Sequence, residues 1–128
     1  MKLNEIQKQI DKTEYWDMEI LDMKISYFGD EIEILIDDEG EDCWKIVFLS
    51  CYKVYYEAVA DIRDNDGRIK FLKRPQLGFY GQDISVSQSD TKDLYKITMD
   101  LSIMDMVVEC KDVEVSRISK SDLKLFWM

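Results

Sequence analysis

The chain has 128 residues, a formal net charge of −10 and no histidine. This length suits a single domain that buries its core without a disulfide or a metal. Because histidine is absent, the usual serine and cysteine triads, most zinc hydrolases and the commonest general base are excluded. Three cysteines, Cys43, Cys51 and Cys110, show no close paired spacing, so we expect reduced and mostly buried thiols.

The amino-terminal stretch "MKLNEIQKQIDK" is polar and has no apolar run typical of a signal peptide. Nowhere do about eighteen apolar residues follow one another, which is the length that a membrane-spanning helix needs. We therefore expect a cytoplasmic protein that makes no membrane contact.

The first part of the chain predicts a short helix and then a β-hairpin. Asn4 can cap a helix within residues 1–14, which contain a weak apolar stripe. Beyond this helix the period changes to two, because apolar and polar residues alternate over 21–27 and again over 31–36. The intervening "FGDE" favours a turn, so these two strands are expected to form a hairpin.

The middle of the chain predicts a buried strand and two turns. Residues 43–49, "CWKIVFL", are apolar on both faces except at Lys45, which places this strand centrally in the sheet. The stretch at 51–61 either continues this strand or forms the next one. The Asp-Gly pair in "RDNDGRIKF" favours a tight hairpin turn, and "KRPQLGFYGQD" is typical of a loop, here presenting Phe79 and Tyr80.

The last part of the chain predicts several further strands. Residues 95–103 show the cleanest alternation, and "VVEC", "VEVSRI" and the terminal "LKLFW" also indicate strands. In all, about eight strands follow one helix. We therefore expect a mainly β single domain over 1–128, with a helical lead-in at 1–14 and a sheet over 16–128. The strands are predicted to form an antiparallel meander, closed as a barrel or folded as a sandwich.

The negative charge is concentrated in one segment. Residues 14–42 hold twelve acids and a single base, Lys24. Acids in turns and on edge strands keep a sheet soluble, which explains acidic residues in general but not their concentration. A surface that meets a basic protein explains both the acidic segment and the basic residues elsewhere. The same field argues against binding to nucleic acid or to anionic lipid.

We therefore predict a site that binds a basic protein partner. Its candidate residues are the seven acids within 31–42 and one exposed aromatic anchor: Glu31, Glu33, Asp37, Asp38, Glu39, Glu41, Asp42 and Tyr80. The acids of the turn are expected in solvent, where their carboxylates would take the place of substrate phosphates against the partner's lysines and arginines. No catalytic residue, metal site or cofactor is predicted, and a homodimer contact at the terminal Phe126 and Trp127 stays open.

Two other classes of function stay open. A barrel that holds a small molecule or lipid would suit the aromatic residues of the central strands: Trp44, Phe48, Tyr52, Tyr55 and Tyr56. A nucleic-acid binder or a histidine-free enzyme would use the basic stretch beside Phe71: Arg63, Arg68, Lys70, Lys73 and Arg74. A calcium loop at "DNDG" is excluded, because Ile62 and Lys73 occupy the two ends of the pattern.

A small acidic chain with a tryptophan opening its first strand, as in "YWDMEIL", and a buried "CWKIVFLSCY" strand resembles a known group of proteins. These are the varied bacterial immunity proteins encoded beside polymorphic or contact-dependent toxins. The resemblance spans the chain and concerns its small size, its acidic charge and its β-rich pattern. It includes no diagnostic motif, so no site residue is carried over. It implies a cytosolic, non-enzymatic inhibitor that covers the active site of a cognate and often basic toxin, such as a nuclease.

Overall fold

One strongly curved antiparallel sheet forms most of the computed structural model, which describes residues 2–58 and 68–127. The main elements are α1 (Lys2–Asp11), β1 (Ile20–Ser26), β2 (Glu31–Asp37), β3 (Asp42–Ala58), β4 (Phe79–Gln88), β5 (Tyr95–Ser102) and β6 (Met104–Ser119). Single turns of 3-10 helix lie between or after them at η1 (Tyr27–Gly29), η3 (Ile69–Phe71), η4 (Arg74–Gln76) and η5 (Lys120–Asp122).

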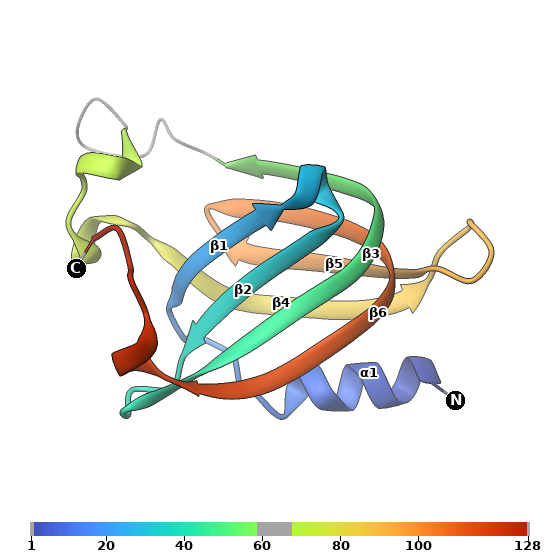
Figure 1. Ribbon diagram of the computed structural model, residues 1–128, viewed down its shortest axis with the longest axis horizontal. Coiled ribbons are helices and arrows are strands. Elements are labelled where there is room, and N and C mark those ends of the chain that lie inside the picture. Colours follow the sequence, from blue (N-terminus) through green and yellow to red (C-terminus); the bar gives the residue numbers. More distant parts are fainter. Residues whose placement is uncertain (1, 59–67, 128) are drawn as a thin grey trace.

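The sheet order is β1-β2-β3-β6-β5-β4, and every neighbouring pair is antiparallel. The sheet curls so that β4 and β5 lie behind β1 and β2 (Figure 1). Its two edges approach at one point, where an isolated bridge joins Glu19 to Tyr80. There Gly81 also donates to Met18 O and accepts from Asp17 N, each at 2.8 Å. The described residues thus form one open, curled sheet, so the predicted closed barrel and the alternative sandwich are both wrong. The predicted meander is interrupted once, because β6 and not β4 lies beside β3.

The described part of the chain has six strands, fewer than the eight expected, because two strands are unusually long. The residues from 51 continue the central strand as β3, which bends at a register shift between Cys51 and Lys53. Such a bulge lets a long strand follow a curved sheet without ending. Likewise "VVEC" and "VEVSRI" are one strand, β6, while "LKLFW" follows η5 as an irregular segment. The hairpin predicted in "RDNDGRIKF" lies largely outside the described residues.

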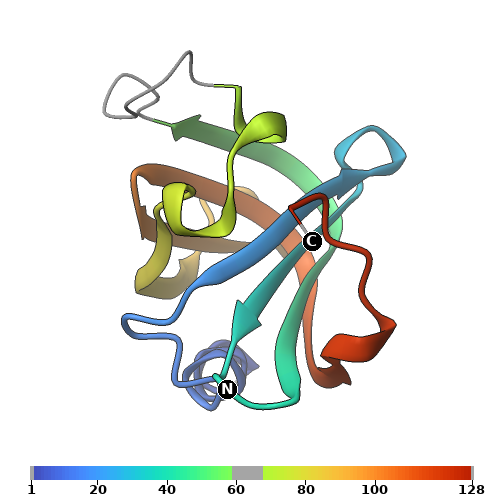
Figure 2. The ribbon, with the colours of Figure 1, turned by 90° about the vertical axis from the view of Figure 1, so that its left-hand side faces the viewer.

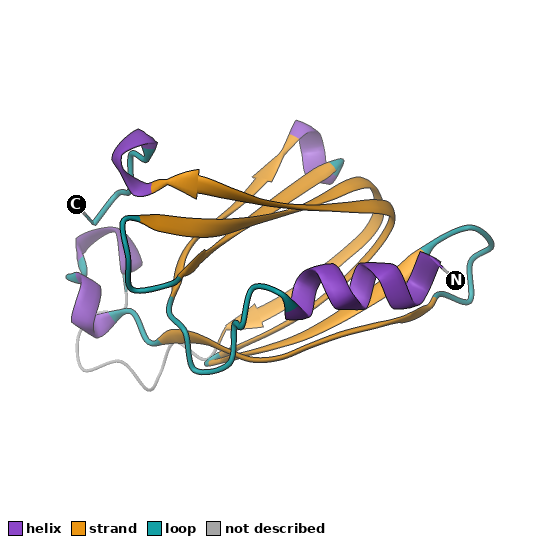
Figure 3. Cartoon of the chain, turned by 90° about the horizontal axis from the view of Figure 1, so that it is seen from below, coloured by secondary structure: helices purple, strands orange, loops and turns teal. Residues whose placement is uncertain are grey.

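The main core fills the concave face of the sheet. The alternating residues Ile32, Ile34 and Ile36 of β2 are fully buried there, as their period of two predicted. The helix α1 lies along the open side of the curl (Figure 3) and adds Ile6 and Ile10 to this core. It is shorter than the predicted 1–14.

The outer edge of β4 is covered by side chains of the amino-terminal segment. The Gln7 amide donates to Ile84 O at 2.9 Å and accepts from Val86 N at 2.7 Å, so it pairs with β4 much as another strand would. The Tyr15 hydroxyl accepts from Ile84 N at 3.0 Å. Because an exposed edge invites pairing with other chains, this cover protects the sheet from aggregation.

The carboxyl-terminal segment lies over the convex face of the sheet (Figure 2), and a second, smaller core lies beneath it. Leu125 packs there against Leu21, Leu35 and Cys43. Trp127 fixes the segment, because its indole N–H donates to Leu21 O at 3.0 Å. The extra layer explains why β1 and β2 each bury a residue on both faces of the sheet.

Cys43 and Cys110 are buried, Cys51 is half-buried, and all three are free thiols in the structure. No helix among the described residues is long and apolar enough to cross a membrane.

Candidate partner-binding surface

The acidic turn, residues 37–42 between β2 and β3, begins with a buried carboxylate. Asp37 was expected in solvent, but it is only 5 % exposed. Its carboxylate contacts the Arg74 guanidinium at 2.9 Å and the Lys120 ammonium. The turn is therefore attached to η4 and to η5, two segments that are distant in the sequence.

The environment of Asp37 favours its charged form. Burial would raise the pKa of this carboxyl, since a charge in a poorly hydrated site is costly. The hydrogen bonds from Lys120 and from the Glu39 backbone N–H, together with the charges of Lys120 and Arg74, outweigh burial and lower the pKa below its ordinary value. Asp37 is thus a carboxylate paired within its own chain.

Two further acids of the turn share one arginine. Arg117 of β6 contacts Asp38 and lies 3.6 Å from Asp42. Its guanidinium is also 4.8 Å from the centre of the Trp44 ring, a cation–π distance. By contrast, Glu39 and Glu41 are exposed and make no ion pair within the described residues. These two side chains are the turn's uncompensated charges.

The other predicted acids lie away from the turn. Glu31 and Glu33 project from the convex face of β2 and, with Glu114 of β6, form what we call the acidic strip. Glu33 pairs with Lys45 at 3.3 Å. Because β2 rises by about 3.3 Å per residue, Glu31 and Asp37 are about 20 Å apart. The structure therefore divides the predicted acidic site into two regions at opposite ends of β2.

Tyr80, the predicted aromatic anchor, stands at the junction of the two sheet edges. It bridges to Glu19 and is 41 % exposed. Glu19 in turn contacts Arg74 at 2.8 Å and its backbone carbonyl accepts from Asp37 N. Tyr80 is thus closer to the acidic turn than to the acidic strip. Phe79, expected beside it in a loop, packs against the core.

An exposed aromatic group that the sequence pattern did not predict lies at the other end of β2. Tyr27 and Phe28 of η1 lie beside Tyr52 and Tyr56 of β3 and line a hollow with them. The position of Tyr27 and Phe28 was missed because both adopt left-handed backbone conformations, with φ of 53° and 58°, which a strand pattern does not signal.

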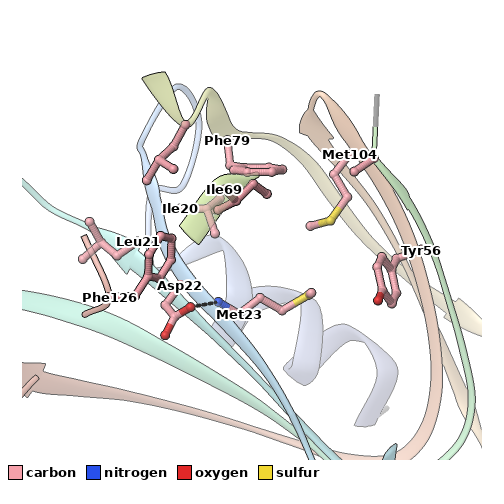
Figure 4. Close-up of a pocket in the computed structure, with 11 residues that line it drawn as sticks. Ile20, Leu21, Asp22, Met23, Tyr56, Ile69, Phe79, Met104 and Phe126 are labelled. Atoms are coloured by element: carbon pink, nitrogen blue, oxygen red, sulfur yellow. Dashed lines mark hydrogen bonds between the residues drawn. The ribbon is translucent and has the colours of Figure 1, made fainter. Parts of the chain in front are cut away.

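An apolar cleft between β1 and the second half of β3 is one feature that bears on a small-molecule role. Side chains from both sides line it, among them Ile20, Met23, Tyr56 and Met104 (Figure 4). Burial raises the pKa of Asp22 at its rim, against the opposing hydrogen bond from Met23 N. The cleft measures about 240 Å³, which is below the range of about 300–1,000 Å³ typical of ligand pockets.

The basic stretch is partly engaged within the chain. Arg74 pairs with Glu19 and Asp37 and stacks over the Trp127 ring at 5.0 Å. Arg68 lies over the Phe71 ring at 4.9 Å, and Arg63 falls outside the described residues. Among those residues, no group of three or more cysteine, aspartate or glutamate side chains is placed to hold a metal ion.

Comparison with known proteins places the chain among the immunity proteins. The family model described as "Immunity protein PIM7" matches residues 2–117. Because this match spans most of the chain, the protein belongs to that family, and the resemblance seen in its sequence is confirmed. No curated protein matches it.

A solved structure shares the fold. It is described as the "Crystal structure of an uncharacterized protein from Neisseria gonorrhoeae" and aligns with a TM-score of 0.56 at 12% identity. The alignment covers 80% of this chain and 92% of that one. At this identity the likeness concerns the fold alone.

Proposed function

We propose that this protein is a cytoplasmic, non-enzymatic inhibitor that binds a basic toxin and covers its active site. The observation that carries this proposal is the match to an immunity protein family over residues 2–117. The net charge of −10 supports a basic partner, because a field of one sign speeds the encounter with a surface of the other sign.

The mechanism we propose is occlusion, which requires a stable surface and no reacting group. Glu39 and Glu41 are free to meet lysines or arginines of the toxin. Asp38 and Asp42 stay part of the proposed contact, with Arg117 holding their carboxylates in place. Asp37 supports the turn from beneath, and Tyr80 would add an apolar contact near the same end. Glu31 and Glu33 would extend the contact along the convex face.

Growth protection tests this proposal. Each toxin domain encoded in the source organism would be expressed in a laboratory bacterial host, with and without this protein. We expect one basic toxin to stop growth alone and to be neutralised by coexpression, with the two purified proteins forming a stable complex. If the protein relieves none of the toxins, or relieves one without binding it, the proposal is contradicted.

A further inference from the structure

Exposed aromatic side chains line a hollow of about 600 Å³ at the η1 end of the molecule, which we call the aromatic groove. Its apolar lining residues are Ile25, Tyr27, Phe28, Tyr52, Val54 and Tyr56. Phe28 is fully exposed, and Tyr27 and Tyr52 are each 73 % exposed. Contiguous apolar groups at this exposure are uncommon on a monomer and mark interaction sites.

The backbone holds these rings outside the core. Tyr27, Phe28 and Gly29 are three consecutive residues with positive φ, which a bulky side chain adopts at a cost in energy. On the facing strand, the register shift after Cys51 turns Tyr52 toward η1. A hydrogen bond of 2.9 Å from Cys51 N to Asp30 O joins the two walls. The groove is therefore built by two irregular backbone segments that contact each other.

Negative charge borders the groove. Asp30 is among its lining residues, and Tyr27 also borders the acidic strip of Glu31, Glu33 and Glu114 on its other side. Among the described residues that line that second hollow, Lys45 is the single base, and it is already paired with Glu33. A ligand that fills the groove thus meets aromatic rings at the centre and carboxylates at the rim.

We infer that the aromatic groove is the anchor site for the toxin and takes an apolar side chain that is flanked by lysines or arginines on the toxin surface. This inference rests on the proposed function. Tyrosine-rich, well-packed centres dominate the energy of many protein interfaces, while charged rims set association rate and partner choice. A second copy of this chain fits less well, because two acidic rims and two net charges of −10 would repel.

Three variants test the inference against the toxin that the wild-type chain neutralises. Phe28→Asn and Tyr52→Ala each remove one ring from the groove, and asparagine tolerates the left-handed backbone at position 28. Tyr55→Ala is the matched control, because Tyr55 is an exposed tyrosine of the same strand that lies outside the groove and donates to Glu57. Thermal midpoints of all three variants show whether the fold is kept.

We expect Phe28→Asn and Tyr52→Ala to weaken toxin binding by about thirty-fold or more, while Tyr55→Ala binds as wild type. Phe28→Asn should keep or raise the thermal midpoint, since it relieves backbone strain, so its lost binding would not reflect unfolding. Wild-type affinity in both groove variants would overturn the inference and leave the proposed function intact. A wild-type chain that binds none of the toxins would instead overturn the proposed function.

The reactivity of Cys51 gives an independent test of whether the toxin covers the aromatic groove. Its half-buried thiol lines the groove, whereas Cys43 and Cys110 are buried. We expect iodoacetamide to modify Cys51 in the free protein and to react more slowly in the toxin complex. An unchanged rate would contradict the inference. Sedimentation of the free protein tests whether a second copy of this chain occupies the groove instead. If the wild-type protein forms a dimer and Phe28→Asn dissociates it, the groove belongs to a second copy and the inference is overturned.

Discussion

The Asp37 carboxylate joins three segments, because it contacts Arg74 after β3, Lys120 after β6 and the backbone of its own turn. Its pKa is lower in the folded chain than its ordinary value of 3.8. The folded state therefore favours the charged form, and this contribution to stability is fully present above the ordinary pKa. It is lost as the pH falls through the lowered pKa.

Replacing Asp37 by Asn should lower the free energy of unfolding by about 3 kcal/mol near neutral pH, since Arg74 and Lys120 lose their buried partner. The difference from wild type should shrink as the pH falls below the ordinary aspartate pKa. Denaturant unfolding across this pH range measures both effects. Asp122→Asn is the control, an exposed carboxylate without an ion pair among the described residues, and should change little. A difference that stays constant with pH would contradict this role of Asp37.

Gly81 is the second residue on which a local prediction rests. A Cβ at this position would lie 2.5 Å from the backbone oxygen of Tyr15, in the segment that closes the sheet edges. We expect Gly81→Ala to destabilise the fold by about 1–3 kcal/mol, the usual cost of overpacking. Gly40→Ala is the control, because its Cβ would approach Asp38 Oδ1 no closer than 3.4 Å. Equal thermal midpoints of the two variants would show that the edge junction tolerates the methyl group.

At the scale of elements, the carboxyl-terminal segment after η5 acts as a cover for the convex face. Removing residues 123–128 would expose Leu21, Leu35 and Cys43, which now pack beneath Leu125. We expect a loss of about 2–4 kcal/mol in the free energy of unfolding, as for deletion of a large buried side chain. Burial raises the pKa of the Cys43 thiol in the intact chain, so Cys43 should react with a thiol reagent only in the shortened one. An unreactive Cys43 in both would contradict the covering role.

The period of two identifies the faces correctly where one face of a strand is exposed, as in β5, because burial there follows alternate residues. In β2 the alternation of burial ends after Ile34, because Leu35 is covered by the carboxyl-terminal segment. The same alternation predicted two strands in place of β6, separated at Lys111 and Asp112, since two polar residues in a row also indicate a turn. The alternation alone could not predict that the strand continues, because its extension there depends on pairing with β3, in which Leu49 pairs with Asp112.

Only the negative charge of the candidate site could be predicted from the sequence. The concentration of acids within 14–42 is visible in the sequence, but their pairing with Arg74, Arg117 and Lys120 depends on folding of distant segments. For this reason the sequence could not separate the buried Asp37 from the free Glu39 and Glu41. The aromatic groove was missed on similar grounds, because it brings a turn and the far half of β3 together.

At the scale of the whole molecule, the two unpaired acids of the turn, the acidic strip and the net charge of −10 together produce a negative field around the protein. Such a field acts on a partner before contact, so it changes the association rate more than the dissociation rate. Charge and aromatic contacts therefore have two separate roles in the proposed complex: charge brings a basic toxin to the surface, and aromatic contacts retain it.

The association rate of this protein with the toxin that it neutralises, measured by stopped flow at increasing salt, tests this account most directly. We predict a rate that falls about tenfold or more between low salt and about 0.5 M salt, because screening shortens the reach of the field. Glu31→Gln, Glu39→Gln and Glu41→Gln combined should lower the rate at low salt and flatten this dependence. A rate that is indifferent to salt, and equal in wild type and in this variant, would contradict the central claim that the protein captures a basic toxin through its acidic surface.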